Sequence, residues 1–516
     1  EHQDNFICPP EHKKLLDDLK ERVRRSSTTS YSYSARWGGV VDDKPLATDL
    51  DRFRDLVTNQ LKKDIDAMFP DDGEERSELD MERDLHEQFM EKRSRRFVGR
   101  RDILTDLFKF ADSTSSSSPI VIHGLPGFGK SALASRFCRT YAEQRPGAFV
   151  LSHFVDASSN SSDIRFTLWR LCTELKKEYQ IREEVPETYK ELKQAFPRFL
   201  EQSAFGRPCV IVIDSLQQFN KDSNRAQTME WLPSVTPVKV IVSTYTNSPS
   251  YDALRYRQPE FPFIEVGELP EADRKDLVRF ALLEYRKKLE ESPTNNQMRM
   301  MIRKSESCKP LWLVTACEEL CLFGVYEKLS EEVKRLPAYI PTLYNYVLQR
   351  LEKDFGQEMV SNALCYIACS RVGLTEMELL HLLAPEGRDI LPQAKWAQLN
   401  RGLEKFLRSV GYGESATFAF VHHEIHAAVT KRYFRVKDRA QKTHAALAAY
   451  FMVQADPLGD RSWNTDDSRA ISELPYHLME SKQADELERV LCDFRFIAKK
   501  VHFGMTYELA TDLFEA

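Results

Sequence analysis

The chain has 516 residues, too many for one hydrophobic core, so we expect about three to five domains. Hydrophobic residues make up 42% and charged residues 29% of the chain, which is the balance of an ordinary globular protein. The formal net charge of −6 argues against a surface dedicated to nucleic acid. No uninterrupted apolar run approaches the roughly 20 residues of a membrane helix, which argues against a membrane partner.

The ten cysteines are scattered and lack the spacings of redox motifs and zinc sites. Two pairs, Cys317/Cys321 and Cys365/Cys369, stand four residues apart in apolar helical patterns and are expected in the core. We therefore expect a reducing, cytoplasmic setting.

Residues 1–92 are expected to form the C-terminal part of an N-terminal domain, followed by a linker helix. The chain begins with Glu1 rather than Met, so we expect it to be a piece of a longer protein. Helices are predicted over Lys13–Arg25 and Asp49–Phe69, the second with apolar residues at helical spacing. A third helix, Asp80–Lys92, is so highly charged that we interpret it as a solvated linker.

Residues 93–267 are predicted to form an α/β domain. Short, continuously apolar runs alternate with helical segments, which is typical of a parallel sheet covered by helices on both faces. The predicted strands are 120–124, 148–155, 209–213, 238–244 and 263–266. Ligands of such sheets lie at the carboxyl ends of the strands, where Gly124, Asp214 and Thr244 are found.

The segment that begins at Gly124 and ends with Gly129-Lys130-Ser131 matches the phosphate-loop pattern G-x-x-x-x-G-K-[ST]. The glycines let the backbone close around an anion, and the loop N–H groups and the positive end of the next helix face the phosphates. Lys130 is expected to reach the β- and γ-phosphates, and Ser131 to hold Mg²⁺. An ordinary glycine-rich turn is the alternative, but the strand before the loop and the helix after it favour the phosphate loop. The predicted nucleotide-binding residues here are Gly124, Gly127, Phe128, Gly129, Lys130, Ser131 and Ala132.

Asp214, after the third apolar run, is the expected second acidic element and would bind Mg²⁺ through water opposite Ser131. Capping of a turn is the alternative role for Asp214. Many phosphate-loop hydrolases carry further carboxylates just beyond this position, whereas here Gln217 and Gln218 follow. A missing general base costs about 10²–10⁴-fold in rate, although an amide is able to position water. We therefore predict nucleotide binding with slow or absent hydrolysis, with Asp214 and Gln217 as the catalytic candidates.

From Glu271 onward the sequence is mostly helical. A hairpin is expected near Arg408–His422, and Thr375 with Glu378 forms a capping box at a helix start, which together are consistent with a winged helix. Residues 268–343 are predicted to form a helical domain, residues 344–436 a winged helix, and residues 437–516 a helical segment.

His422, His423 and His426 form a cluster in the predicted winged helix. Metal binding would need further ligands, and His423-Glu-Ile-His426 is one residue short of H-E-x-x-H. A hydrogen-bonded helix start and a nucleotide-sensing histidine are the other interpretations of the cluster.

Residues 95–516 resemble the signal-transduction ATPases with numerous domains, called STAND ATPases, and within them the NACHT-type modules of the nephrocystin-3 and telomerase protein component 1 group. The marks of the resemblance are Phe97–Arg100, Gly124–Ser131, Ser152–Val155, Val210–Asp214, Lys309–Leu313, Glu318–Gly324 and Phe420–His422. The resemblance implies a phosphate-loop α/β domain, a helical domain, a winged helix and a helical segment, usually followed by TPR or WD40 repeats.

The resemblance also implies site roles and a mechanism. The adenine edge would be formed by Phe97, Val98, Gly99 and Arg100. Pro310 matches the residue that packs on the base, and His422 matches a winged-helix histidine near the β-phosphate of ADP. ADP would clamp the winged helix onto the nucleotide domain, and exchange for ATP would open it for homo-oligomerisation or a protein partner. Tyr245 stands where an arginine often follows the sensor strand, and this departure puts γ-phosphate sensing in question.

Three other functions fit parts of the sequence. A motor ATPase that remodels protein or nucleic acid would turn over at about 1 s⁻¹ or faster, and the two glutamines after Asp214 argue against it. A static scaffold with a permanently filled pocket would keep one assembly state with ATP, with ADP and without nucleotide. Nucleic-acid binding through the winged helix would rest on a modest basic cluster, Lys431, Arg432, Arg435, Lys437 and Arg439.

Overall fold

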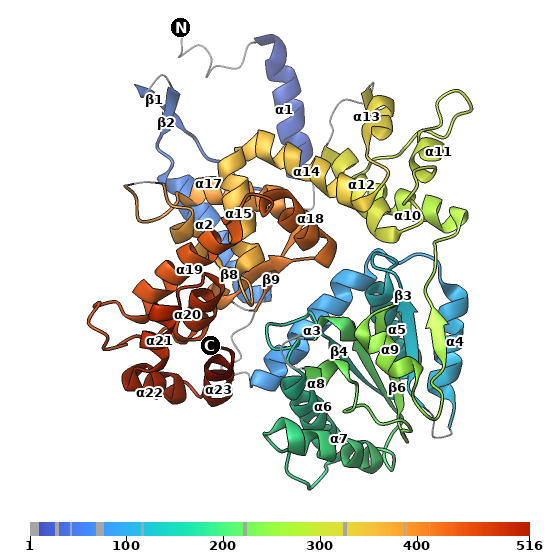
Figure 1. Cartoon of the computed structure of the whole chain (residues 1–516). Helices are drawn as coiled ribbons and strands as arrows, with labels where there is room; N and C mark the ends of the chain where they lie inside the picture. The colour runs from blue at the N-terminus through green and yellow to red at the C-terminus, as the bar shows by residue number, and fades with distance from the viewer. Residues whose placement is uncertain are drawn as a thin grey trace. The chain divides into compact units, whose positions relative to one another are not determined.

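The structure is a computed structural model (Figure 1) that divides into two compact units, Glu1–Ser77 and Glu78–Ala516. It describes residues 10–25, 30–41, 44–68, 77–114, 118–219, 224–322, 328–385, 387–411 and 413–516. The end of the predicted Glu318–Gly324 mark lies outside these ranges.

The first unit contains two helices and a hairpin. Helices α1, Pro10–Arg25, and α2, Asp51–Met68, confirm the two predicted helices. Between them, β1, Arg36–Val41, pairs antiparallel with β2, Lys44–Thr48, and the sequence did not indicate this hairpin. Its strands are short, and the glycine pair in β1 obscures any alternation of apolar and polar residues. Helix α2 buries none of its residues, so its apolar stripe lies open in this unit.

A five-stranded parallel sheet forms the centre of the nucleotide domain in the second unit, with strand order β4-β5-β6-β3-β7. The strands are β3 Ile120–Gly124, β4 Phe149–Phe154, β5 Cys209–Asp214, β6 Lys239–Tyr245 and β7 Phe263–Glu265. All five lie where the apolar runs predicted them. Because every pairing is parallel, all the carboxyl ends meet at one edge of the sheet.

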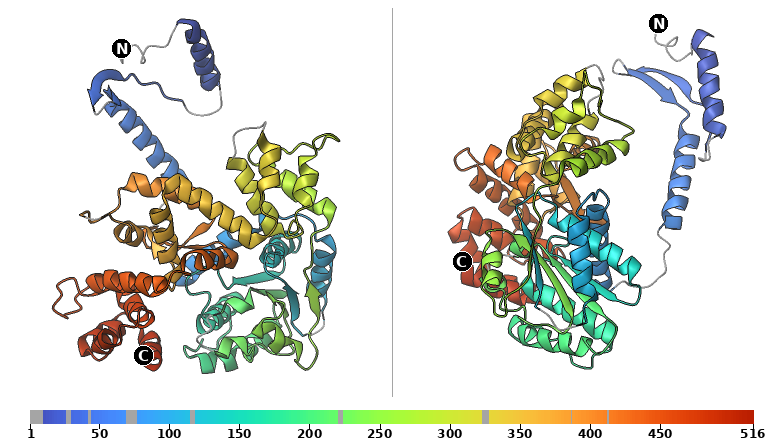
Figure 2. Two further views of the ribbon diagram at one scale, coloured as in Figure 1. Left: turned by 45° about the horizontal axis from the view of Figure 1, so that its top comes forward. Right: turned by 90° about the vertical axis from the view of Figure 1, so that its right-hand side faces the viewer.

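Helices cover both faces of this sheet, as predicted (Figure 2). Alternate residues of β5 point to opposite faces: Val210 and Val212 join a core with α4 and α5, while Ile211 and Ile213 join a core with α6 and α7. The helices of this domain are α3 Glu78–Ser94, α4 Arg101–Asp112, α5 Lys130–Gln144, α6 Ile164–Tyr179, α7 Tyr189–Ser203, α8 Asn224–Gln227 and α9 Pro249–Arg255.

Helix α3 corrects one prediction, because it is not a solvated linker. It packs against α5 and β4, with Leu79 and His86 buried and the Phe89 ring 5.0 Å from that of Phe154. The backbone N–H of Phe154 donates to His86 Nδ1 at 3.1 Å. The high charge of α3 hid a narrow face of Leu, His and Phe at helical spacing, which is enough to anchor the helix.

The rest of the second unit is helical, apart from the three-stranded antiparallel sheet β8-β10-β9 of the winged helix. The predicted hairpin and the capping box of Thr375 and Glu378 are both confirmed. The elements up to the winged helix are α10 Glu271–Leu283, α11 Gln297–Ile302, α12 Pro310–Leu322, α13 Leu329–Arg335, α14 Ile340–Phe355, α15 Gln357–Cys369, β8 Leu374–Thr375, α16 Glu376–Leu382, α17 Gln393–Leu403, β9 Leu407–Val410, β10 Thr417–Phe420 and α18 His423–Tyr433. The last helices are α19 Arg439–Ala455, α20 Ser468–Glu480, α21 Ala484–Leu491, α22 Phe494–His502 and α23 Thr506–Glu515.

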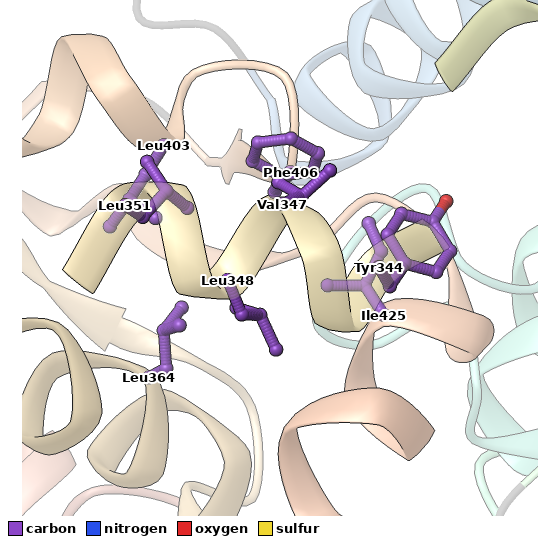
Figure 3. Close-up of a pocket in the computed structure, with 8 residues that line it drawn as sticks. All are labelled: Tyr344, Val347, Leu348, Leu351, Leu364, Leu403, Phe406 and Ile425. Atoms are coloured by element: carbon purple, nitrogen blue, oxygen red, sulfur yellow. The ribbon is translucent and has the colours of Figure 1, made fainter. Parts of the chain in front are cut away.

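One hydrophobic core runs through helices α10 to α22, from Leu269 to Phe496. The predicted domain boundaries at 343/344 and 436/437 therefore fall within a shared core, and the subdivision remains a prediction. A cavity of about 10 Å³ in this core (Figure 3) has room for at most about one water, so it is a small packing gap. Its lining residues are Tyr344, Val347, Leu348, Leu351, Leu364, Leu403, Phe406 and Ile425.

Arg371, between α15 and β8, joins the winged helix to α20. Its Nη2 atom lies 3.1 Å from Oε1 of Glu473, a carboxylate that is only 1% exposed. Burial alone would raise the pKa of Glu473, but the nearby imidazole of His477 and the charges of Arg371 and Arg469 lower it to about 2. Glu473 is therefore an ionised group in the core, held so by its neighbours.

None of the helices in the described parts of the chain combines the length and the apolar content that crossing a membrane requires.

Candidate nucleotide-binding site

The phosphate loop connects the end of β3 at Gly124 to the start of α5 at Lys130. Gly127 and Gly129 have φ angles of 81° and 86°, in the left-handed region that favours glycine. A Cβ atom on Gly124 would lie 2.5 Å from the carbonyl oxygen of Val266, so no larger residue fits there. The loop thus leads the chain into α5 with the helix N-terminus at the carboxyl edge of the sheet, where a phosphate is favoured.

Lys130 is only 5% exposed and is held by the loop itself. Its Nζ atom donates to the carbonyl oxygens of Gly124 at 2.8 Å and Leu125 at 3.0 Å, and it lies 4.4 Å from the ring centroid of Tyr245. Burial lowers the pKa of Lys130 to about 8, although the charge of Asp214 opposes the shift. A buried ammonium whose direct partners are carbonyl oxygens is poised to bind an anion.

We expect nucleotide binding at pH 9 to take up close to one proton, and almost none at pH 7. Lys130 with a pKa near 8 is mostly neutral at pH 9, whereas a bound polyphosphate would restore its charge. Calorimetric titrations in two buffers of different ionisation enthalpy measure the uptake. The nearby Tyr245 will not interfere, because burial raises its pKa to about 12. Equal uptake at both pH values would contradict the assignment.

The same pKa shift makes a prediction for the nucleotide-free protein. Between about pH 8 and 10.5 the folded chain binds fewer protons at Lys130 than the unfolded chain does. Its contribution to the unfolding free energy therefore rises with pH across this window, and bound nucleotide should remove that slope.

Asp214, the last residue of β5, is 1% exposed and lies at the same edge. Its carboxylate accepts hydrogen bonds from Ser243 Oγ at 2.5 Å and from Ser215 Oγ at 3.0 Å. The Ser215 hydroxyl also lies 3.5 Å from Ser131 Oγ, so the structure brings the two predicted Mg²⁺ residues together through one serine. Hydroxyl and carboxylate oxygens are the ligands that Mg²⁺ prefers, and this donor set fits the ion.

Ser215 and Ser243 were not predicted as site residues, and the sequence drew attention instead to Thr244 at the end of the same strand as Ser243. The hydroxyl of Thr244 instead lies 2.9 Å from Ser248 Oγ, because neighbouring residues of a strand point to opposite faces. The run of hydroxyls that ends β6 was the available signal, but it did not specify which hydroxyl faces Asp214.

Gln217 lies in a single 3-10 turn, Leu216–Gln218, directly after Asp214 and Ser215. Both polar atoms of its side-chain amide are buried without a hydrogen-bond partner. Buried amides normally find a partner, so this one is available to a water or a ligand. The predicted role of Gln217 in positioning water remains a prediction.

The segment Phe97–Arg100 joins the sheet domain to the helical core. Phe97 packs on the core beside α4 and α5, while Val98 packs on the core of the later helices. Gly99, with a φ of 77°, leaves room for Asp273, whose carboxylate would lie 2.2 Å from an added Cβ. Arg100 donates to the carbonyl oxygens of Glu268, at 3.2 Å, and of Gly267. The base-edge role of these residues remains a prediction.

Arg96, just before this segment, reaches the helical domain. Its Nε donates to Glu284 at 2.8 Å, and its Nη1 to Glu318 at 2.7 Å. These hydrogen bonds raise the pKa of Arg96, although burial alone would lower it. The guanidinium therefore links the segment after α3 to the C-terminal end of α10 and to α12.

Pro310 is the first residue of α12 and lies against the phosphate loop. Its Cγ atom would be 3.7 Å from a Cβ built on Gly129, and the N–H of Leu311 donates to the carbonyl oxygen of Gly127 at 3.3 Å. The structure thus places Pro310 against the phosphate loop. Contact with a base remains a prediction.

Two family models match this architecture. Residues 96–241 match the AAA ATPase domain family, and residues 342–441 match the NWD1-like, winged helix-turn-helix domain family. The chain carries an AAA ATPase domain and an NWD1-like winged helix. This pair of domains is consistent with the NACHT-type NTPase that the sequence predicted.

The relatives of the chain include telomerase protein component 1 of Rattus norvegicus, 28% identical over 98% of this chain and 20% of the relative. NACHT domain- and WD repeat-containing protein 1 of Homo sapiens is 26% identical over 76% of this chain and 28% of the relative. The chain thus spans about a fifth of the telomerase component. Among solved structures it is similar to the Aeropyrum pernix ORC1 protein in complex with DNA, with a TM-score of 0.32, 14% identity, and coverage of 66% of this chain and 94% of that one.

The NWD1-like winged helix contacts α3, which packs against the AAA ATPase domain, at His422, the N-cap residue of α18. The ring atoms Nε2 and Nδ1 of His422 lie 3.1 and 3.2 Å from Nη1 of Arg93, and Nη2 of Arg93 donates to the carbonyl oxygen of Val421 at 2.7 Å. Burial, followed by the charges of Arg93 and Arg408, holds the pKa of His422 well below its ordinary value. A neutral imidazole therefore faces a guanidinium here.

The other two histidines of the cluster have different surroundings. His426 Nε2 lies 3.3 Å from the carbonyl oxygen of Ala368, and the His423 and His426 rings are 6.1 Å apart. The described residues of the NWD1-like winged helix and of the AAA ATPase domain contain no group of three side chains arranged to hold a metal. The metal interpretation of this cluster therefore finds no support, and the proximity of His422 to a β-phosphate remains a prediction.

Proposed function

We propose that the chain is a nucleotide-dependent switch of the STAND class, in which ATP or ADP with Mg²⁺ sets how the helical and winged-helix parts sit on the AAA ATPase domain. The observation that carries the proposal is a direct contact between the phosphate loop and a later domain. The N–H of Leu311, in the first turn of α12, donates to the carbonyl oxygen of Gly127. A change in the conformation of that loop would therefore act directly on the first turn of α12.

The residues have distinct roles in this proposal. Lys130 binds the β- and γ-phosphates, and Ser131 with Asp214 holds Mg²⁺, which would offset the charge of the phosphates. The base lies by Phe97–Arg100 and Pro310, while His422 lies near the β-phosphate. To turn a closed-to-open ratio of 99:1 into 1:99, ATP must favour the open form by about 5.5 kcal/mol relative to ADP.

Hydrolysis is slow in this proposal, because Gln217 and Gln218 stand where carboxylates would activate water. A remodelling motor is the alternative and would release phosphate at about 1 s⁻¹ or faster. A phosphate-release assay on the purified chain separates the two, and a rate well below 1 s⁻¹ supports the switch.

Protein partners and homo-oligomerisation in the open state belong to the same proposal, as does signalling or scaffolding in the cytoplasm. The names of several relatives include WD repeats or tetratricopeptide repeats, which suits proteins that assemble with others. The cysteines that the structure describes are free thiols, in keeping with a reducing compartment.

The proposal is tested by identifying the nucleotide that denatured, purified protein releases, and by light scattering with ADP, with a non-hydrolysable ATP analogue and without nucleotide. We expect stoichiometric ADP or ATP and an assembly state that depends on the nucleotide. The same assembly state in all three conditions would favour a static scaffold and overturn the switch.

A further inference from the structure

Two arginines from different domains lie on one phenylalanine ring. The guanidinium carbon of Arg93, on α3, is 5.0 Å from the ring centroid of Phe89, and that of Arg408, on β9 of the winged helix, is 6.0 Å from it. Nη2 of Arg408 lies 2.5 Å from Oδ1 of Asp156. The hydrogen-bond partners of Arg93 are instead a neutral imidazole and a backbone carbonyl. Arg408 is therefore paired with a carboxylate, whereas the hydrogen-bond partners that the described residues give Arg93 are uncharged.

The arginine pair lies at the carboxyl edge of the sheet. Asp156 stands two residues beyond the end of β4, and Phe154 of β4 is in register with Asp214 of β5. The N–H of Val155 donates to the carbonyl oxygen of Asp214 at 3.2 Å. Burial and the charge of Arg408 lower the pKa of Arg93, while Asp156, Asp214 and Tyr245 act in the opposite direction. The carboxylates of Asp156 and Asp214 at this edge therefore act on the charge of Arg93, whose hydrogen bonds go to the winged helix.

We propose that Arg93 binds the terminal phosphate of a nucleoside triphosphate, and that it leaves Val421 and His422 of the winged helix when it does so. This inference rests on the proposed switch and names its sensor. Guanidinium groups bind phosphate through paired, charge-assisted hydrogen bonds, which outweigh those to a neutral ring and a carbonyl. Arg408 keeps its ion pair with Asp156 and adds positive potential to the site. Arg93 therefore supplies the positive charge that Tyr245 does not supply at the end of β6.

The proposal predicts a loss that is selective for the triphosphate. A diphosphate leaves Arg93 on the winged helix, whereas a triphosphate offers it an anion. Substituting Arg93→Gln should therefore raise the ratio of the dissociation constants of a non-hydrolysable ATP analogue and ADP by about tenfold or more, as expected for losing a hydrogen bond to a charged group. Fluorescent analogues of both nucleotides, titrated in the same buffer with Mg²⁺, measure this ratio.

Arg136→Gln is the matched control, because Arg136 is an exposed arginine of α5 and the change in net charge is the same. Its ratio should stay within about twofold of wild type. Arg93→Lys keeps a positive charge and should raise the ratio less than Arg93→Gln, and it serves as the test variant if the glutamine variant does not fold.

If Arg93 only holds the winged helix in place, its substitution would weaken the binding of ADP at least as much as that of the triphosphate. The ratio of the dissociation constants would then stay the same or fall. That result in both Arg93 variants would overturn the inference while leaving the proposed switch intact. Failure of the wild-type chain to bind either nucleotide would instead overturn the proposed function itself.

Discussion

Purified Lys130→Ala protein should carry no nucleotide, and its affinity for added ATP and ADP should be weaker by about 100-fold or more. The substitution removes a buried cation and its charge-assisted hydrogen bonds to the phosphates, each of which is worth about 1.5–3 kcal/mol. The cost is high because Nζ is held inside the loop by Gly124 and Leu125, where water does not screen it well. Analysis of the supernatant after denaturation, together with equilibrium titration, measures both effects.

Lys109→Ala is the control for this experiment, because Lys109 lies on the surface of α4 and pairs with Asp106 of the same helix. It should retain nucleotide like the wild type. A Lys130→Ala protein that still co-purifies with stoichiometric ADP would show that the loop does not bind phosphate through Lys130, and the proposed function would fail with it.

Arg371→Ala should destabilise the second unit by about 3–5 kcal/mol, the usual cost of removing one member of a buried ion pair. We expect the lower end of this range, because Arg371 itself is 31% exposed while Glu473 is 1% exposed. The loss should appear as a fall of several degrees in the melting temperature of the nucleotide-free chain. Arg388→Ala removes an exposed arginine of the same domain and should shift the melting temperature by about 1 °C or less.

Acid titration gives an independent check on this ion pair. The pKa of Glu473 lies near 2 in the folded state and near 4.5 in the unfolded chain, so its contribution to stability is complete above about pH 4.5 and is lost as the pH falls toward 2. In Arg371→Ala the folded-state pKa should rise, and this acid-dependent contribution should shrink. An unchanged pH profile together with an unchanged melting temperature would mean that Arg371 does not hold Glu473 ionised.

The sheet and the phosphate loop could be predicted because their signals are local. A strand buried on both faces appears in the sequence as a continuous apolar run, and β5 is the clearest case. The phosphate loop needs glycine at Gly127 and Gly129 for its backbone angles, so the motif and the geometry coincide. The capping box of Thr375 is likewise contained in one helical turn.

The rest of the site depends on partners that are distant in the sequence. Charge along α3 suggested a solvated helix, because the residue that Phe89 and His86 pack against, Phe154 of β4, follows many residues later in the sequence. The contact of Arg93 with Val421 could not be predicted either, because Val421 belongs to the winged helix and is distant in the sequence. The choice between Ser243 and Thr244 turned on which face of β6 meets Asp214, and a one-residue shift inverts that choice.

The unbroken core of the later helices has a mechanical consequence. Any split inside it would expose indole rings such as those of Trp312 and Trp396, at about 25 cal/mol for each Å² of apolar surface. The contact surface between this core and the sheet domain is different, because polar contacts such as Leu311 to Gly127 and Arg408 to Asp156 cross it. Water replaces such polar contacts at small cost in free energy. Helices α10 to α22 would therefore move as one rigid body, with residues 266–270 between β7 and α10 as the covalent link to the sheet, and a displacement of ångströms at the loop would be magnified at the far helices.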